Sequence, residues 1–189
     1  MRYLDYEPDD IDVQVAELLV ATSDSADPLL HPKVPEALRI LREHLKMDVV
    51  FVSQFRDNRR TFRVVDSNPN KTIIKAGMSD PLEESWCQRV VDGRLPQLVK
   101  DAKPHIEAGD VPAPAFEIGT HLSTPIVLKN GNVYGTLCCF SHNVNEGVGS
   151  LDLKRLQITA RLLAEDLHDT AAATEMELQP LPDHGFKRA

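Results

Sequence analysis

The most constraining feature of the sequence is a pair of alternating segments joined by Lys129-Asn130-Gly131-Asn132. Asn-Gly suits the positive backbone dihedral angles of a tight turn, so these residues predict a β-hairpin. Residues 118–128 precede the turn, residues 133–142 follow it, and the first segment alternates with a period of two. Two long antiparallel strands therefore result.

A second hairpin is predicted upstream. Residues 47–55 carry β-branched and aromatic side chains on both faces, which is typical of a central strand covered on both sides. Residues 56–60 contain Asp57-Asn58 and predict a solvated turn, after which residues 61–66 form the partner strand. Residues 95–99 add a short strand.

Two amphipathic helices flank the strands. Apolar residues recur at spacings of four, three and four from Val34 to Leu45 and predict a helix over residues 31–47. Residues 151–168 predict a second helix, whose apolar stripe is wider than packing on one sheet requires. The extra width indicates a neighbouring helix, and we expect a homodimer built on this surface.

The remaining segments predict shorter elements. A short helix is expected near the N-terminus, ending near Ser23, and another over residues 82–92, capped by Ser79 or Asp80. Residues 101–116 hold three prolines without a clear period and predict a long surface loop.

This order of helices and hairpins indicates an α+β fold with an antiparallel sheet. The length of 189 residues fits one domain of ordinary size. We expect an acidic N-terminal segment with a short helix over residues 1–30, a domain over residues 31–170 and a tail over residues 171–189.

The net charge and the number and spacing of the cysteines narrow the range of possible functions. The net charge of -8 argues against nucleic acid and anionic lipid as partners. No apolar run is long enough to span a bilayer, and the acidic N-terminus is unlike a signal peptide, so a cytoplasmic protein is expected.

The three cysteines fit reduced thiols, and without Cys-x-x-Cys or His-x-x-x-His spacing no metal site is expected. Nucleotide-binding and hydrolase motifs are absent, so a binding module is favoured over an enzyme, and no cofactor can be assigned.

Four segments together resemble the GAF domain of sensory and signalling proteins. They are Ser85-Trp86-Cys87 through Gly93, Leu98 through Ala102, Ser123-Thr124-Pro125-Ile126, and Gly131 through Phe140. The resemblance covers residues 31–170. It implies a six-stranded antiparallel sheet with terminal helices on one face and a small-molecule pocket on the other, under short helices and the long loop. It also implies a sensory module that passes its signal through helix packing in a dimer, with a separate output protein or domain.

Two branches of the family differ from this chain. Free methionine sulfoxide reductases resemble it around Cys87 but also need a cysteine in the long loop, and residues 101–118 have none. Phytochrome-like members attach bilin at a cysteine usually followed by histidine, whereas Gln88 follows Cys87 here. A small redox enzyme using Cys87 and a ligand-free dimerisation scaffold remain the alternatives to a sensor, although a buried structural role is common for a free cysteine.

The expected pocket lies between one sheet face and the helix that carries Trp86. Hydroxyl groups on an otherwise apolar strand face need partners, which a cavity supplies more readily than a dry core. A shift of one residue in strand register would place Val50, Val52, His121 and Ser123 there instead. The expected ligand-binding residues are Phe51, Ser53, Ser85, Trp86, Cys87, Asp101, Thr120, Leu122 and Thr124.

Overall fold

The computed structural model describes residues 9–22, 27–71 and 73–177, and its centre is a six-stranded antiparallel sheet. The strands lie in the order β3-β2-β1-β6-β5-β4. Two hairpins, β1–β2 and β5–β6, meet at the central pairing of β1 with β6. The strands are β1 (Val49–Arg56), β2 (Arg59–Ser67), β3 (Ser79–Pro81), β4 (Leu98–Val99), β5 (Thr120–Val127) and β6 (Val133–Ser141).

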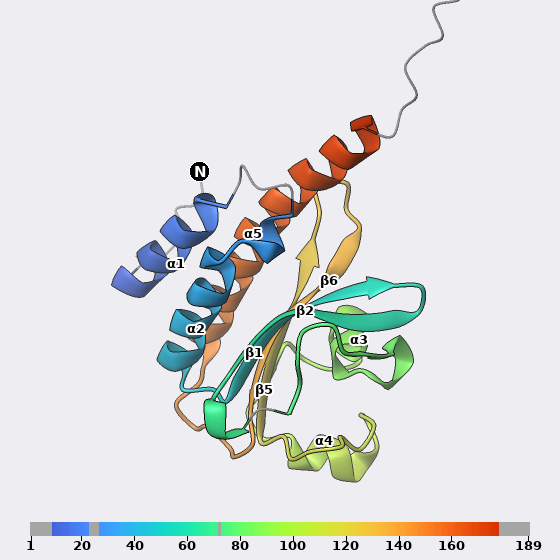
Figure 1. Cartoon of the computed structure of the whole chain (residues 1–189). Helices are drawn as coiled ribbons and strands as arrows, with labels where there is room; N and C mark the ends of the chain where they lie inside the picture. The colour runs from blue at the N-terminus through green and yellow to red at the C-terminus, as the bar shows by residue number, and fades with distance from the viewer. Residues whose placement is uncertain (1–8, 23–26, 72, 178–189) are drawn as a thin grey trace, which may run out of the picture.

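The helices divide between the two faces of the sheet. Figure 1 shows α1, α2 and α5 together on one face and α3 and α4 on the other. This arrangement confirms the predicted α+β fold with terminal helices on one side. The helices are α1 (Asp10–Val20), α2 (Lys33–Leu45), α3 (Trp86–Val91), α4 (Lys103–Ala108) and α5 (Ser150–Glu177), with 3-10 turns η1 (Pro28–Leu30), η2 (Pro69–Lys71) and η3 (Leu82–Glu84).

The main core lies between the sheet and the helices α1, α2 and α5. Alternation sends one set of strand side chains into this core, where Val50, Leu122 and Cys139 are fully buried. The opposite set, which includes Phe51, Cys138 and Phe140, forms a second cluster on the face of α3. Both faces of β1 are therefore buried, as its sequence predicts.

The pairing of β1 with β6 allows no side chain at Gly135. A Cβ atom there would lie 1.9 Å from the backbone oxygen of Ser53. Glycine permits this close approach of two backbones. The pairing places Phe51 opposite Cys138 and Val49 opposite Phe140, which fixes the residues that share the face of α3.

Two local elements differ from the sequence predictions. Residues 101–116, predicted to be an irregular loop, contain α4, because Pro104 lies in its first turn and Gly109 ends it at a positive φ of 77°. The predicted helix over residues 82–92 is divided into η3 and α3. Its N-cap is Ser85, whose hydroxyl accepts a hydrogen bond from the backbone N–H of Gln88, rather than Ser79 or Asp80.

The broad apolar stripe of α5 packs on β5 and β6 and also contacts α1. The neighbouring helix that the stripe predicts is thus present within the chain itself. Helix α5 runs to Glu177, into the segment predicted as a tail, and residues 1–8 and 178–189 lie outside the described part of the chain.

Across the described ranges, no helix combines the length and apolar character needed to cross a membrane.

Candidate functional site

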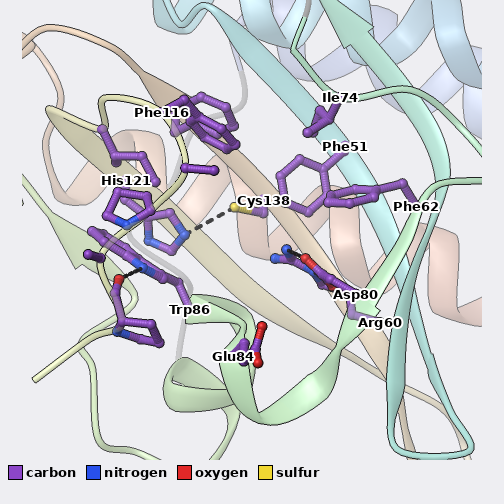
Figure 2. Close-up of a pocket in the computed structure, with 16 residues that line it drawn as sticks. Phe51, Arg60, Phe62, Ile74, Asp80, Glu84, Trp86, Phe116, His121 and Cys138 are labelled. Carbon is purple, nitrogen blue, oxygen red and sulfur yellow. Dashed lines mark hydrogen bonds and ion pairs between the residues drawn. The ribbon is translucent and has the colours of Figure 1, made fainter.

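A cavity of about 350 Å³ lies on the face of the sheet that α1, α2 and α5 leave free. The sheet supplies its floor, α3 one wall, and the loop after α4 its roof (Figure 2). This volume falls within the range of small-molecule sites. The lining residues are Phe51, Arg60, Phe62, Ile74, Asp80, Glu84, Trp86, Pro112, Ala113, Pro114, Ala115, Phe116, Ile118, His121, Cys138 and Phe140.

Aromatic rings form a large part of the apolar wall. Phe51 meets Phe62 edge to face with ring centroids 4.9 Å apart, and Phe116 stacks on Phe140 at 5.2 Å. Such contacts restrict the rings to a few orientations. The cavity therefore offers a largely preformed apolar surface to a ligand.

Arg60 brings a charge into this apolar site. Its guanidinium group lies 4.6 Å from the centroid of the Phe62 ring, and its Nε donates to Asp80 Oδ1 at 3.0 Å. Burial would lower the pKa of Arg60, but the negative charges of Cys87 and Asp80 raise it above its usual value, so the group stays charged. The prediction of a solvated turn over residues 56–60 is wrong for Arg60, because β2 already begins at Arg59.

Hydrogen bonds connect the roof of the cavity to α3. The indole Nε1 of Trp86 donates to the backbone oxygen of Pro112 at 3.0 Å, and Arg89 Nε donates to the backbone oxygen of Asp110 at 3.1 Å. Trp86 is 5% exposed and also contacts the ring of His121. A ligand that displaces the roof would therefore also act on α3.

Cys87, His121 and Cys138 form a buried polar cluster at the base of the cavity. The Nε2 atom of His121 lies 3.2 Å from the sulfur of Cys138, and Arg60 Nη1 donates to the sulfur of Cys87, also at 3.2 Å. A hydrogen bond from the Cys138 thiol and the charge of Arg60 hold the pKa of Cys87 well below its usual range, despite burial. Burial and the neighbouring Cys87 thiolate raise the pKa of Cys138. Of the two thiols, Cys87 is therefore the one that ionises first.

The structure brings only part of the predicted ligand-binding set to the cavity. Phe51 and Trp86 line it, and Cys87 lies in the cluster at its base. The hydroxyl of Ser85 is used as the cap of α3 and donates to the backbone oxygen of Leu82. Asp101 is exposed, and its carboxylate accepts a hydrogen bond from the backbone N–H of Lys103.

The side chains of β5 lie on the opposite faces of the sheet from those expected. Leu122 belongs to the core beneath the helices, and Thr124 lies opposite Leu137 of that same core. Thr120 Oγ1 donates to the backbone oxygen of Lys100 at 2.6 Å. The hydroxyl of Thr120 thus finds its partner within the protein and not in the cavity.

The β5 residues that alternate with these lie on the cavity side instead. His121 lines the cavity, and Ser123 pairs with Cys138 on the same face. Ser53 also lies on this side, but its hydroxyl is 2.9 Å from Thr136 Oγ1 and contributes to strand pairing rather than to the lining. Pairing with β6 decides which face each β5 residue occupies.

Comparison with known proteins is consistent with this architecture. A family model of the GAF domain matches residues 34–167, and a comparison with curated proteins finds no match. The GAF domain of an Acinetobacter phosphoenolpyruvate-protein phosphotransferase is similar, with a TM-score of 0.63 and 15% identity over 88% of this chain and 93% of that one.

Two further solved structures resemble the chain. One is the phycoerythrobilin-bound GAF domain of a cyanobacterial phytochrome, with a TM-score of 0.65 and 14% identity over 89% of this chain and 100% of that one. The other is the free methionine-R-sulfoxide reductase of Neisseria meningitidis in complex with its substrate, with a TM-score of 0.65 and 14% identity over 92% of this chain and 99% of that one. The structural likeness shows the shared fold, and the match of the family model over residues 34–167 shows that the chain belongs to the GAF domain family.

Proposed function

We propose that this GAF domain is a sensory module that binds a small, mainly apolar organic molecule in the cavity beneath α3. The observation that carries the proposal is the aromatic-lined cavity of about 350 Å³, with the charged groups of Arg60, Asp80 and Glu84 at its margin. Apolar walls with a few placed polar groups are typical of ligand sites. Two of the similar structures hold a small molecule, a bilin in one and a substrate in the other. The free thiols of this chain suit a reducing compartment, and we place the protein in the cytoplasm.

The proposed signal begins at the roof of the cavity. A ligand that prefers one arrangement of the roof shifts the population of α3 through the hydrogen bond of Trp86 to Pro112. Helix α3 contacts β5 and β6, and these strands also contact α5. The signal therefore has a continuous packed route to the helical face.

We assign a second copy of the chain to that helical face. An apolar groove between α1 and α5 is lined by Val13, Val20 and Ile158 among others, and these three are 46%, 61% and 36% exposed. Exposed apolar surface of this kind favours association. An output protein or domain would respond to the arrangement of the two copies.

A library of small molecules and extracts from the host, screened by thermal shift, tests the ligand proposal. A ligand at one hundred times its dissociation constant should stabilise the folded chain by about 2.7 kcal/mol. It should also change the fluorescence of Trp86, the single tryptophan. Native mass spectrometry of protein isolated from its host would identify the molecule.

A pair of variants shows whether a hit occupies the cavity. Phe116→Ala removes a ring from the cavity wall and should weaken binding about tenfold, since aromatic contacts contribute about 1 kcal/mol or more. Thr124→Val, on the helical side of β5, should leave binding unchanged. If no compound binds, or if both variants bind equally well, the scaffold alternative replaces the sensor.

A redox enzyme that uses Cys87 is the second candidate. The observation that favours it is the nearby thiol of Cys138, which could form a disulfide with Cys87 during turnover. The roof loop, residues 109–119, holds no cysteine, unlike the pattern of the methionine sulfoxide reductases. Turnover of free methionine sulfoxide with a thioredoxin system, lost in Cys87→Ser, would establish this candidate.

A further inference from the structure

Three ligand-type side chains converge at the base of the cavity from three separate elements. Cys87 comes from α3, His121 from β5 and Cys138 from β6, and their ligand atoms all lie within 4.8 Å of one another. Their exposed fractions are 0%, 2% and 1%. Figure 2 shows His121 and Cys138 directed toward each other beside the cavity.

We propose that Cys87, His121 and Cys138 bind a thiophilic divalent cation of the zinc class, whose fourth coordination position faces the cavity. Tetrahedral bonds of about 2.3 Å to sulfur and about 2.0 Å to nitrogen place the ligand atoms about 3.5 to 3.8 Å apart. The sulfur of Cys138 and Nε2 of His121 lie 3.2 Å apart. All three ligand atoms lie within 4.8 Å of one another, so side-chain movements of about 1 Å would bring them to these separations.

The hydrogen bonding of His121 provides an independent observation. Its Nδ1 atom is buried and has no hydrogen-bond partner within the described residues, and its Nε2 lies 3.2 Å from the weakly polar sulfur of Cys138. A buried imidazole without strong partners is costly. Coordination through Nε2 would exchange this weak contact for a bond to the cation, with Nδ1 carrying the proton of the neutral ring.

The charges around the cluster balance once a divalent cation is present. Two thiolates and a neutral imidazole neutralise the cation, while Asp80 neutralises Arg60. Arg60 Nη1, 3.2 Å from the sulfur of Cys87, would then donate to a coordinated thiolate as a supporting hydrogen bond.

Three protein ligands leave one position of a tetrahedral cation open. His121 and Cys138 both line the cavity, so this position faces the space in which a small molecule would bind. A nitrogen, oxygen or sulfur atom of that molecule could complete the coordination. Only this last step rests on the proposed sensory function, because the three ligands are all supplied by the chain.

Cobalt(II) and zinc titrations of the reduced, chelator-treated chain test the site without any organic ligand. We expect one cation per chain, with the intense thiolate-to-cobalt bands and the visible bands of tetrahedral cobalt. Cys87→Ser and Cys138→Ser should each weaken binding at least about 100-fold, because even supporting residues around metal sites contribute 10- to 100-fold.

Cys139→Ala is the matched control, since Cys139 is the adjacent cysteine but belongs to the core beneath the helices. It should bind cobalt as the wild type does. Zinc should also protect Cys87 and Cys138 of the wild type from alkylation and from forming a disulfide, a measurement that needs no variant. Imidazole should alter the visible bands of the cobalt form by entering the open position.

Several results would overturn the proposal. Failure of the wild type to bind, absence of thiolate-to-cobalt bands, or equal losses in the Cys138 and Cys139 variants would each contradict the site. A Cys87–Cys138 disulfide that forms equally fast with and without zinc would identify a redox pair instead. A cobalt spectrum unchanged by imidazole would contradict the open position. None of these results bears on whether the cavity binds an organic ligand, which is measured separately with Phe116→Ala.

Discussion

Cys87 has surroundings that distinguish it from an ordinary core cysteine. It is fully buried, yet Arg60 donates to its sulfur and Cys138 offers it a thiol hydrogen bond. These interactions favour the thiolate and lower its pKa in the folded state. The ionisation of one side chain is therefore linked to the stability of the domain.

This linkage predicts a pH-dependent effect of Cys87→Ser in the presence of a chelator. The unfolded thiol has a pKa of about 8.5, so between the folded and unfolded values only the unfolded chain holds the proton. The free energy of unfolding of the wild type should rise with pH in this window, by at most about 1.4 kcal/mol per pH unit. The contribution is complete above about pH 8.5 and is lost as the pH falls through the folded value.

Denaturant unfolding at a series of pH values measures the effect as wild type minus variant. Cys139→Ala is the control, because burial raises the pKa of Cys139 and its linkage operates only above the unfolded value. A wild-type advantage over Cys87→Ser that stays constant with pH would show that Cys87 is a neutral thiol.

Individual site residues were harder to predict than the strands that carry them. The alternation of β5 predicts a strand, but both of its faces mix apolar and polar residues, so hydrophobicity does not decide which face meets the helices. The hydroxyl of Thr120 is satisfied by Lys100 O across the β4–β5 edge, a contact invisible in the sequence. His121 joins two cysteines from other elements, so no local spacing could reveal the cluster.

At the scale of elements, the cap of α3 positions the wall of the cavity. Ser85 is 1% exposed, and its hydroxyl both accepts from Gln88 N and donates to Leu82 O. A six-residue helix has few internal hydrogen bonds, so its cap contributes a large share of its stability.

Ser85→Ala should lower the free energy of unfolding by about 1 to 2 kcal/mol through the lost cap. Denaturant unfolding measures this change. Ser79→Ala is the comparison, because Ser79 is exposed and does not cap α3. Its effect should remain within about 0.5 kcal/mol. Equal losses in the two variants would contradict the assigned cap.

The central pairing of β1 and β6 yields a second prediction at this scale. Gly135→Ala should destabilise the domain by about 3 kcal/mol or prevent its folding, because the new methyl group would overlap the Ser53 carbonyl. Gly149→Ala, which meets no atom within 4 Å, is the matched control and should unfold near the wild-type midpoint. Thermal and denaturant unfolding distinguish them, and a stable Gly135→Ala protein would show that the strands separate more easily.

Long periodic elements were predictable, whereas short ones were predicted only in part: β4 lies within the strand predicted over residues 95–99, but α4 was missed. The helix from Lys33 and the hairpin around Asn130-Gly131 follow from hydrophobic period and turn chemistry. Helix α4 spans only six residues, which is too short for a period to be visible, and Pro104 and Gly109 alone fix its ends.

At the scale of the whole molecule, the groove between α1 and α5 predicts the association state. Ile158→Glu places a charge in this apolar surface and should convert a dimer into a folded monomer. Light scattering at micromolar concentration measures the mass. Val144→Glu is the control, because Val144 is comparably exposed, at 42%, but lies outside the groove. A wild-type mass of one chain would contradict the dimer.

The order of the strands also has a consequence for synthesis of the chain on the ribosome. The β1–β2 hairpin emerges early, but its inner edge finds a partner only when β6 appears, after most of the domain has been made. Pairing between such distant segments is slow, since a long loop must close first. Until that closure the floor of the cavity is incomplete, and a nascent chain that ends before β6 could neither recognise a ligand nor hide the open edge of β1.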